Sequence, residues 1–196
     1  MLDKLYSLCK EKSHLIFDFD RTLAKIEINW DDWLPGIANV YAKFDINHGF
    51  EYGKNPHEYG NRLVAKHGSA LRKAVNAFNQ AYEAEYLIGF TPYQELLDLI
   101  SGLKDKTLYV YSSNSRATVL GGLEEMGIID RFKQIITGDD VTYVKPNPEG
   151  FKLIDGLEGN ENSFLMIGDS NADRKAAAAA GIDFFECNYF KKYRFG

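Results

Sequence analysis

The stretch HLIFDFDRTL, residues 14–23, decides how the rest of the chain is interpreted. Three apolar side chains, Leu15, Ile16 and Phe17, lead directly into two aspartates, Asp18 and Asp20. A short apolar run of this kind is typical of a buried strand. Two carboxylates so close together repel each other and add nothing to an apolar core. We therefore expect a buried strand whose end carries functional carboxylates.

Composition narrows the class of protein. The chain has 196 residues, 45% of them hydrophobic and 26% charged, as in ordinary globular proteins. A net charge of −5 argues against a nucleic-acid partner held by a broad basic face. No apolar run approaches the ~20 residues of a membrane helix, so we expect no membrane partner. The two cysteines, Cys9 and Cys187, lie far apart in sequence, which favours a reducing, cytoplasmic location. Nothing indicates the oligomeric state.

Alternating strand and helix patterns predict the fold. Helices are expected at 91–102, 115–127, 147–156 and 171–181, the first with Thr91 as N-cap and Pro92 at its first position. Short apolar runs predict strands at 14–19, 106–113, 133–137, 163–169 and 182–187. The order predicts an α/β fold with a Rossmann-like, doubly wound parallel sheet.

Residues 24–90 interrupt this alternation. No segment there is a convincing strand, whereas 32–44, 56–68 and 69–86 have helical patterns. We therefore expect a helical cap, residues 24–90, inserted after the first strand of a core that comprises residues 1–23 and 91–196. The sequence does not decide whether Trp30 and Trp33 in this insert contact a substrate or pack against other residues.

Polar side chains follow three of the expected strands. Ligands of open α/β sheets bind at the carboxyl ends of the strands, so these side chains meet in one cleft if the strands are neighbours. The candidates are Asp18 and Asp20, then Ser112, Ser113 and Asn114, then Asp169, Ser170 and Asp173, with Lys145 in the loop before the third of these strands. Carboxylates gathered in this way need a cation, and a set of hard oxygen ligands selects Mg²⁺ or Ca²⁺ over zinc. Mg²⁺ and Lys145 would supply the local positive field that an acidic protein needs to hold phosphate.

Taken together, four motifs resemble those of the haloacid dehalogenase (HAD) superfamily. DFDRT (18–22) is similar to its nucleophile motif, and YVYSSN (109–114) to its second motif. KPNP (145–148) is similar to the lysine motif, and GDSNAD (168–173) to the acidic motif. The insert resembles a C1-type cap, as in phosphoglycolate-phosphatase-like members. Two residues depart from the pattern: Arg21 and Val144 stand where the family commonly has glycine.

The resemblance implies a Mg²⁺-dependent phosphatase that acts on a small phosphorylated metabolite. Asp18 would be the nucleophile that forms an aspartyl-phosphate, and Asp20 the general acid and base. Ser113, Lys145 and the backbone N–H of Asn114 would bind the phosphoryl oxygens. Asp18, Asp169 and the backbone carbonyl of Asp20 would bind the metal, and Asp173 would orient its waters or Lys145.

Other interpretations remain open. A phosphomutase similar to β-phosphoglucomutase would use the same groups, and a non-catalytic binding protein could share the fold. A metal-free dehalogenase is disfavoured by Asp20 and the acidic cluster. Ser113 could instead cap the following helix, and Asp173 could be a favourable acid in a first helical turn.

Overall fold

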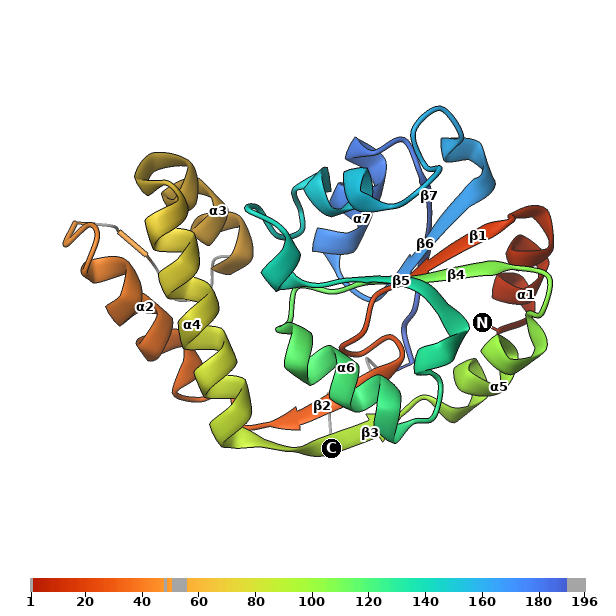
Figure 1. The fold of residues 1–196 in the computed structure, drawn as a ribbon, viewed down its shortest axis with the longest axis horizontal. Coiled ribbons are helices and arrows are strands. Elements are labelled where there is room, and N and C mark those ends of the chain that lie inside the picture. The colour runs from red at the N-terminus through yellow and green to blue at the C-terminus, as the bar shows by residue number, and fades with distance from the viewer. Residues whose placement is uncertain (1, 48, 51–55, 190–196) are drawn as a thin grey trace.

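The computed structural model describes residues 2–47, 49–50 and 56–189 (Figure 1). A core built around a sheet stands beside a smaller helical cap, and two extended segments join them. In chain order the elements are α1 (Leu2–Glu11), β1 (His14–Phe17), β2 (Ala24–Ile28), α2 (Trp33–Ala42), α3 (Pro56–His67), α4 (Ser69–Tyr86), β3 (Leu87–Pro92), α5 (Gln94–Gly102), β4 (Thr107–Tyr111), α6 (Arg116–Glu125), β5 (Phe132–Ile136), β6 (Phe164–Gly168), α7 (Asn171–Ala179) and β7 (Asp183–Glu186).

The central sheet has five parallel strands in the order β5-β4-β1-β6-β7. All five strands expected from apolar runs are present, and the predicted fold class is confirmed. Strand β1 occupies the middle, with Phe17 level with Val110 of β4 and Ile167 of β6. The loops that follow β1, β4 and β6 therefore start at the same edge of the sheet.

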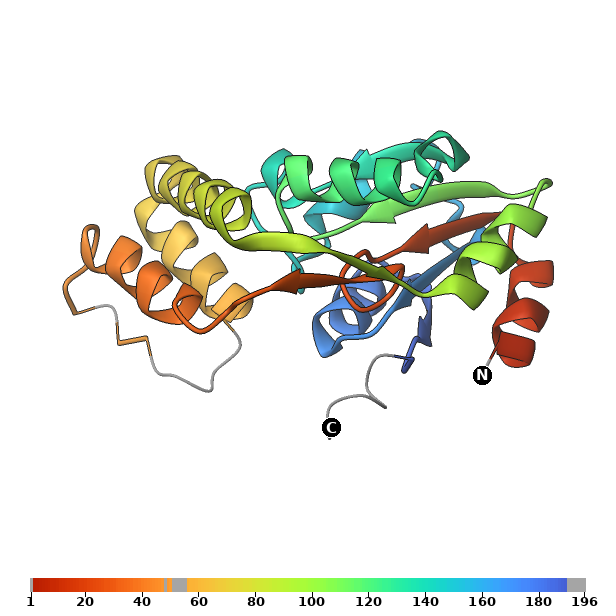
Figure 2. The same cartoon turned by 90° about the horizontal axis from the view of Figure 1, so that it is seen from below.

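Both faces of the sheet are covered, which explains the continuous apolar runs. Leu15 and Phe17 point into a cluster completed by α1, α5 and α6. Ile16 points into the opposite cluster, which includes Ala176 and Ala177 of α7. Figure 1 shows α5 and α6 below the sheet and α7 above it, and Figure 2 shows the sheet from the side of α5 and α6.

The cap helices α2, α3 and α4 have a separate apolar cluster of their own, which includes Ile37, Leu63 and Leu71. A two-stranded antiparallel ribbon, β2 with β3, joins the cap to the core. The expectation that residues 24–90 contain no strand was wrong. Thr91 and Pro92 end β3, and α5 begins only at Gln94 with Tyr93 at its N-cap. The two ribbon strands are separated by the whole cap, so local sequence patterns do not reveal their pairing.

Two further segments differ from expectation. Residues 147–156 contain a 3-10 helix, Pro148–Leu153, in place of an α-helix. Helix α1 was not predicted, although it contributes the buried side chains Leu5 and Cys9. Cys9 and Cys187 are both buried, and burial raises the pKa of Cys9 to about 11.

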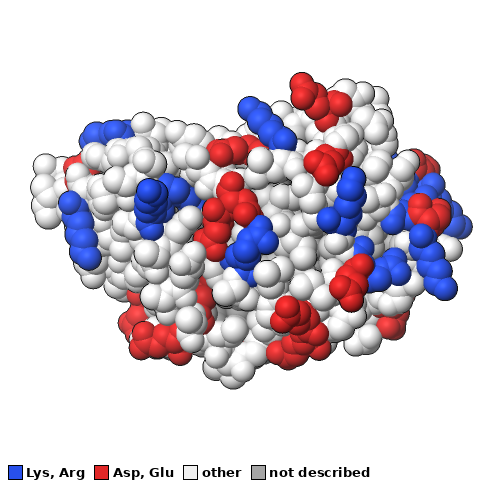
Figure 3. Space-filling view, in the orientation of Figure 1, with Lys and Arg blue, Asp and Glu red and all other residues white. Residues whose placement is uncertain are grey.

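The surface of the described residues carries no single basic field on the face drawn in Figure 3. Lysine and arginine side chains lie scattered among acidic ones over both the core and the cap.

None of the described helices is both long and apolar enough to cross a lipid bilayer.

Two neighbouring glycines in α6 provide a test of the packing between the core and the ribbon. A Cβ at Gly122 would lie 2.4 Å from Phe19 Cζ and 2.9 Å from Phe90 Cε1, whereas one at Gly121 would meet nothing within 4 Å. We expect Gly122→Ala to destabilise the protein by about 1–3 kcal/mol through overpacking. Gly121→Ala should stabilise it by about 0.5–1 kcal/mol through helix propensity. Urea denaturation of both variants measures this; equal effects would show that α6 does not pack closely against Phe19.

Candidate active site

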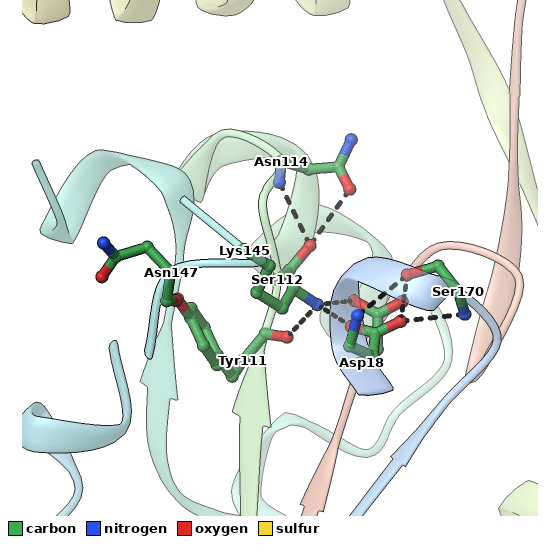
Figure 4. Close-up of polar contacts among 8 residues, drawn as sticks. Asp18, Tyr111, Ser112, Asn114, Lys145, Asn147 and Ser170 are labelled. Carbon is green, nitrogen blue, oxygen red and sulfur yellow. Dashed lines mark hydrogen bonds and ion pairs between the residues drawn. The ribbon is translucent and has the colours of Figure 1, made fainter. Parts of the chain in front are cut away.

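A buried lysine lies at the centre of the candidate site. Lys145 Nζ donates hydrogen bonds to Asp18 Oδ1 at 2.6 Å, to Asp173 Oδ1 at 2.5 Å and to the Tyr111 carbonyl at 2.9 Å. Figure 4 shows the ammonium pointing between the Asp18 carboxylate and the end of β4. Lys145, Asp18 and Asp173 are all less than 9% exposed. Three segments far apart in sequence therefore meet through one ammonium group.

Local structure fixes each carboxylate of this group. Asp18 directly follows β1, and its N–H donates to the Ile167 carbonyl at 2.9 Å, which continues the pairing with β6. Asp173 closes a capping box with Ser170 at the start of α7. Gly168 allows the close approach, since a Cβ there would lie 2.6 Å from Asp173 Cγ. Asp173 is therefore both a helix-capping residue and a partner of Lys145.

The acidic residues form a group that can hold a metal ion. Carboxylate oxygens of Asp18, Asp169 and Asp173 lie within 4.8 Å of one another. Burial, followed by the charges of Asp173 and Asp20, raises the pKa of Asp169 to about 6. Burial and Asp173 also raise the pKa of Asp18, although Lys145 opposes this. A divalent cation would relieve this repulsion, and the oxygen-only donor set fits a hard cation.

Asp20 occupies a separate position. Its Oδ1 accepts a hydrogen bond from Ile26 N at 2.9 Å, and burial raises its pKa. Its side chain does not belong to the carboxylate group of Asp18, Asp169 and Asp173. The resemblance implies a metal contact only for the Asp20 backbone carbonyl, so this position leaves the side chain available for proton transfer.

The backbone of the turn after Asp20 explains why the family commonly has glycine at the position of Arg21. Arg21 adopts φ +62°, the left-handed conformation that glycine adopts without strain. For a residue other than glycine, this left-handed conformation costs about 1–2 kcal/mol of free energy. The turn offsets it through backbone bonds from Arg21 N to Ala24 O and from Ala24 N to Phe19 O. Val144 is not among the described residues with positive φ, so valine fits there without this strain.

The three serines of the loop after β4 make different contacts. Ser112 is fully buried; its hydroxyl donates to Asn114 Oδ1 at 3.0 Å and accepts from Asn114 N at 3.2 Å. Ser115 caps α6 by accepting from Thr118 N, so the capping role considered for Ser113 belongs to Ser115. Ser113 instead lines a pocket between core and cap. Ser112 was among the residues expected at the cleft from its place directly after an apolar strand, but its contact with Asn114 was not predicted.

The pocket beside Ser113 lies between the two parts of the molecule. Its volume is about 20 Å³, and its walls include Trp33, His57, Arg72 and Val144. Trp33 Nε1 donates to Asn79 Oδ1 at 3.0 Å, so this indole is held in place by the cap. Burial and the charges of Lys145 and Arg72 lower the pKa of His57 to about 4, so the imidazole is neutral at physiological pH. The sequence analysis assigned no role to His57 or Arg72.

Comparison with known proteins gives the family. Residues 15–187 match the family model of the haloacid dehalogenase-like hydrolases. The chain therefore belongs to this family, and the prediction of a HAD-like hydrolase enzyme is confirmed.

Individual relatives agree with this placement. The chain is 27% identical to pyrophosphatase PpaX of Oceanobacillus iheyensis, over 91% of this chain and 88% of the relative. It is 30% identical to pyrophosphatase PpaX of Halalkalibacterium halodurans, over 88% and 81%. Among solved structures, a haloacid dehalogenase-like hydrolase from Bacteroides fragilis matches with a TM-score of 0.61 and 26% identity, covering 89% of this chain and 87% of that one.

The Lys145 contacts predict a large stability effect. Lys145→Met removes the cation between two buried carboxylates, so we expect a loss of about 3–5 kcal/mol at neutral pH in chelator. Lys175→Met is the matched control: its partner Glu58 lies 3.3 Å away, and both side chains are about half exposed. That change should cost less than about 1 kcal/mol. Urea denaturation compares the two, and similar losses would show that Lys145 does not neutralise the site.

Proposed function

We propose that this hydrolase removes the phosphoryl group from a small phosphomonoester or diphosphate in a Mg²⁺-dependent reaction that passes through an aspartyl-phosphate. The observation that supports this most is the buried Lys145 ammonium held between Asp18 and Asp173, with Asp169 beside them. A positive group and clustered carboxylates at one strand edge suit an anionic substrate brought in with a metal.

Asp18 is the proposed nucleophile. One of its carboxylate oxygens attacks phosphorus, a new O–P bond forms, and the bond to the leaving oxygen breaks. Its position directly after the central strand fixes the direction of attack. Lys145 holds Asp18 Oδ1 at 2.6 Å, favours its ionised form and stabilises negative charge on the phosphoryl oxygens.

Asp20 is the proposed acid and base. Burial raises its pKa, which favours the protonated form needed to give a proton to the leaving oxygen. In the second step Asp20 takes a proton from water, the water oxygen bonds to phosphorus, and the Asp18–phosphorus bond breaks. Inorganic phosphate then leaves, and Asp18 is restored.

The remaining site residues bind and orient. Ser113 and the N–H of Asn114 are proposed ligands of the phosphoryl oxygens. Asp18, Asp169 and the Asp20 carbonyl would hold Mg²⁺, which when bound neutralises charge on the transferring group. Asp173 would act behind them, through its contact with Lys145.

The substrate is proposed to be small. The cap, residues 24–90 in the predicted division, contacts the loops at the strand edge through Asn61 and Glu83, and a cap in this position admits small molecules more readily than folded macromolecules. Two relatives are named pyrophosphatases, so inorganic pyrophosphate is the first substrate to test here, followed by small phosphorylated acids. A cytoplasmic location is proposed because the two cysteines lie far apart in sequence, which favours a reducing compartment. A product assay with a sugar phosphate would separate hydrolysis from a mutase reaction.

Leaving-group dependence tests Asp20. Asp20→Asn should lower kcat about 10²–10⁴-fold on alkyl phosphates, because no acid protonates the poor leaving oxygen. The loss should be much smaller with p-nitrophenyl phosphate, whose leaving group needs no proton. Asp18→Asn, which lacks a nucleophile, should be inactive on both. If Asp20→Asn loses the same factor on both substrates, Asp20 is not the acid.

Thermal stability tests the metal site independently of turnover. In chelator, the raised pKa of Asp169 means that the folded state binds more protons than the unfolded state between about pH 4 and 6. Stability from this group is therefore lost as pH rises through that range. Asp169→Asn should raise the Tm of the metal-free protein at neutral pH.

The same pair of proteins measures the response to Mg²⁺. Mg²⁺ should raise the Tm of the wild type, since a ligand that binds only the folded state stabilises it, and should do so far less in Asp169→Asn. Glu158→Gln, at an exposed acid, is the control. An equal Mg²⁺ response in all three proteins would place the metal elsewhere.

A further inference from the structure

One buried carboxylate of the cap has no place in the reaction proposed above. Glu83 lies near the end of α4 and is only 3% exposed. A buried charge costs free energy unless several donors surround it, so its partners show what it does.

Those partners all belong to the core. Glu83 Oε2 accepts hydrogen bonds from Ser115 N at 3.1 Å and from the Ser115 hydroxyl. Glu83 Oε1 accepts from Asn114 Nδ2 at 3.4 Å. Ser115 is the N-cap of α6, where free N–H groups and the helix dipole favour a negative charge. A carboxylate from the cap therefore binds the N-cap residue of a core helix.

The same hydrogen bonds continue into the proposed phosphate-binding loop. Asn114 is bonded twice to Ser112, through its own N–H and through its side-chain oxygen. Ser113 lies between these two residues, so a chain of contacts from Glu83 to Asn114 to Ser112 spans the loop. Residues 112–115 are thus held by core backbone bonds, such as Gly138 N to Asn114 O, and in addition by one side chain from the cap.

Two other cap residues contact the neighbouring loop in the same way. Asn61 of α3 donates to the Val144 carbonyl at 2.6 Å and accepts from Val144 N at 3.1 Å, directly before Lys145. Arg72 of α4 donates to the carbonyls of Gly138 and Val141. Each of these side chains forms hydrogen bonds with backbone groups near the residues proposed to bind phosphate. These hydrogen bonds require the cap to be docked on the core.

We propose that Glu83 is a positioning residue that holds loop 112–115 in its phosphate-binding conformation only while the cap is docked. This inference rests on the proposed function of that loop. If docking of the cap orders the loop, then phosphate bound by the loop must favour docking of the cap by the same factor, because such coupling is reciprocal.

The test uses Glu83→Gln, which keeps the size of the side chain. A glutamine amide accepts through one oxygen only, and its NH₂ group would face donors that already point at this site. Glu85→Gln is the matched control, because Glu85 lies on the same helix and is exposed. Both variants are assayed well below their Tm, so that loss of folded protein is not mistaken for loss of positioning.

Three measurements are made on the full chain with Mg²⁺. Hydrogen exchange of a peptide that contains Asn114 and Ser115 reports the loop without any need for activity. The affinity for inorganic phosphate reports the binding site. The values of kcat and KM with p-nitrophenyl phosphate separate positioning from a smaller folded fraction, which would lower kcat alone.

We expect Glu83→Gln to accelerate exchange in this peptide, to weaken phosphate binding about 10-fold and to lower kcat/KM about 10- to 100-fold, as small misplacements of binding groups do. Glu85→Gln should match the wild type in all three measurements. Unchanged exchange and unchanged phosphate affinity in Glu83→Gln would overturn the inference. A wild type that neither binds nor hydrolyses phosphate would overturn the proposed function, whereas the exchange rate would still show whether Glu83 holds the loop.

Discussion

The structure depends on one buried ammonium group shared by two buried carboxylates. Without Lys145, the carboxylates of Asp18 and Asp173 would face each other in a space that excludes most water, with no positive group between them. Their attraction for Lys145 brings the loop after β5, the end of β1 and the start of α7 to one point. A buried ion pair of this kind adds little net stability, but removal of one partner costs several kcal/mol. The arrangement therefore fixes the geometry of the site more than it strengthens the fold.

The cap extends this dependence beyond the sheet. It has its own apolar cluster, so it can keep its structure while it changes position. Its described contacts with the core loops include polar side chains that bind backbone groups, namely Asn61, Arg72 and Glu83. Hydrogen bonds to backbone depend strongly on distance and direction. Small movements on the ribbon of β2 and β3 would therefore break them, while the apolar cluster of the cap stays intact.

Features of the fold that arise from neighbouring residues could be predicted from the sequence, whereas features that join distant residues could not. The run from Leu15 to Phe17 predicts β1, because burial on both faces leaves a local mark in composition. The carboxylates and Lys145 could be gathered at one edge from the rule that ligands bind at the carboxyl ends of parallel strands, whereas the structure supplied the order in which these strands pair. The β2–β3 ribbon and the end of β3 at Pro92 could not be predicted, because their partners lie about 60 residues away. Glu83 also left no signal, because a single acid in an amphipathic helix is usually solvated. Its burial follows only from how the cap sits on the core.

The electrostatics of the site also explain why its carboxylates lower the stability of the folded protein. Asp18, Asp20 and Asp169 all have raised pKa values, and burial is the largest cause in each case. A raised carboxylate pKa means that the ionised form is disfavoured by the fold, so each such group destabilises the protein at neutral pH. Left-handed Arg21, directly after Asp20, adds backbone strain to the same segment. The large apolar clusters on both faces of the sheet stabilise the fold enough to hold these groups in place. An anionic ligand accompanied by a divalent cation would lower the cost of that charge, so binding and stability are coupled at this edge of the sheet.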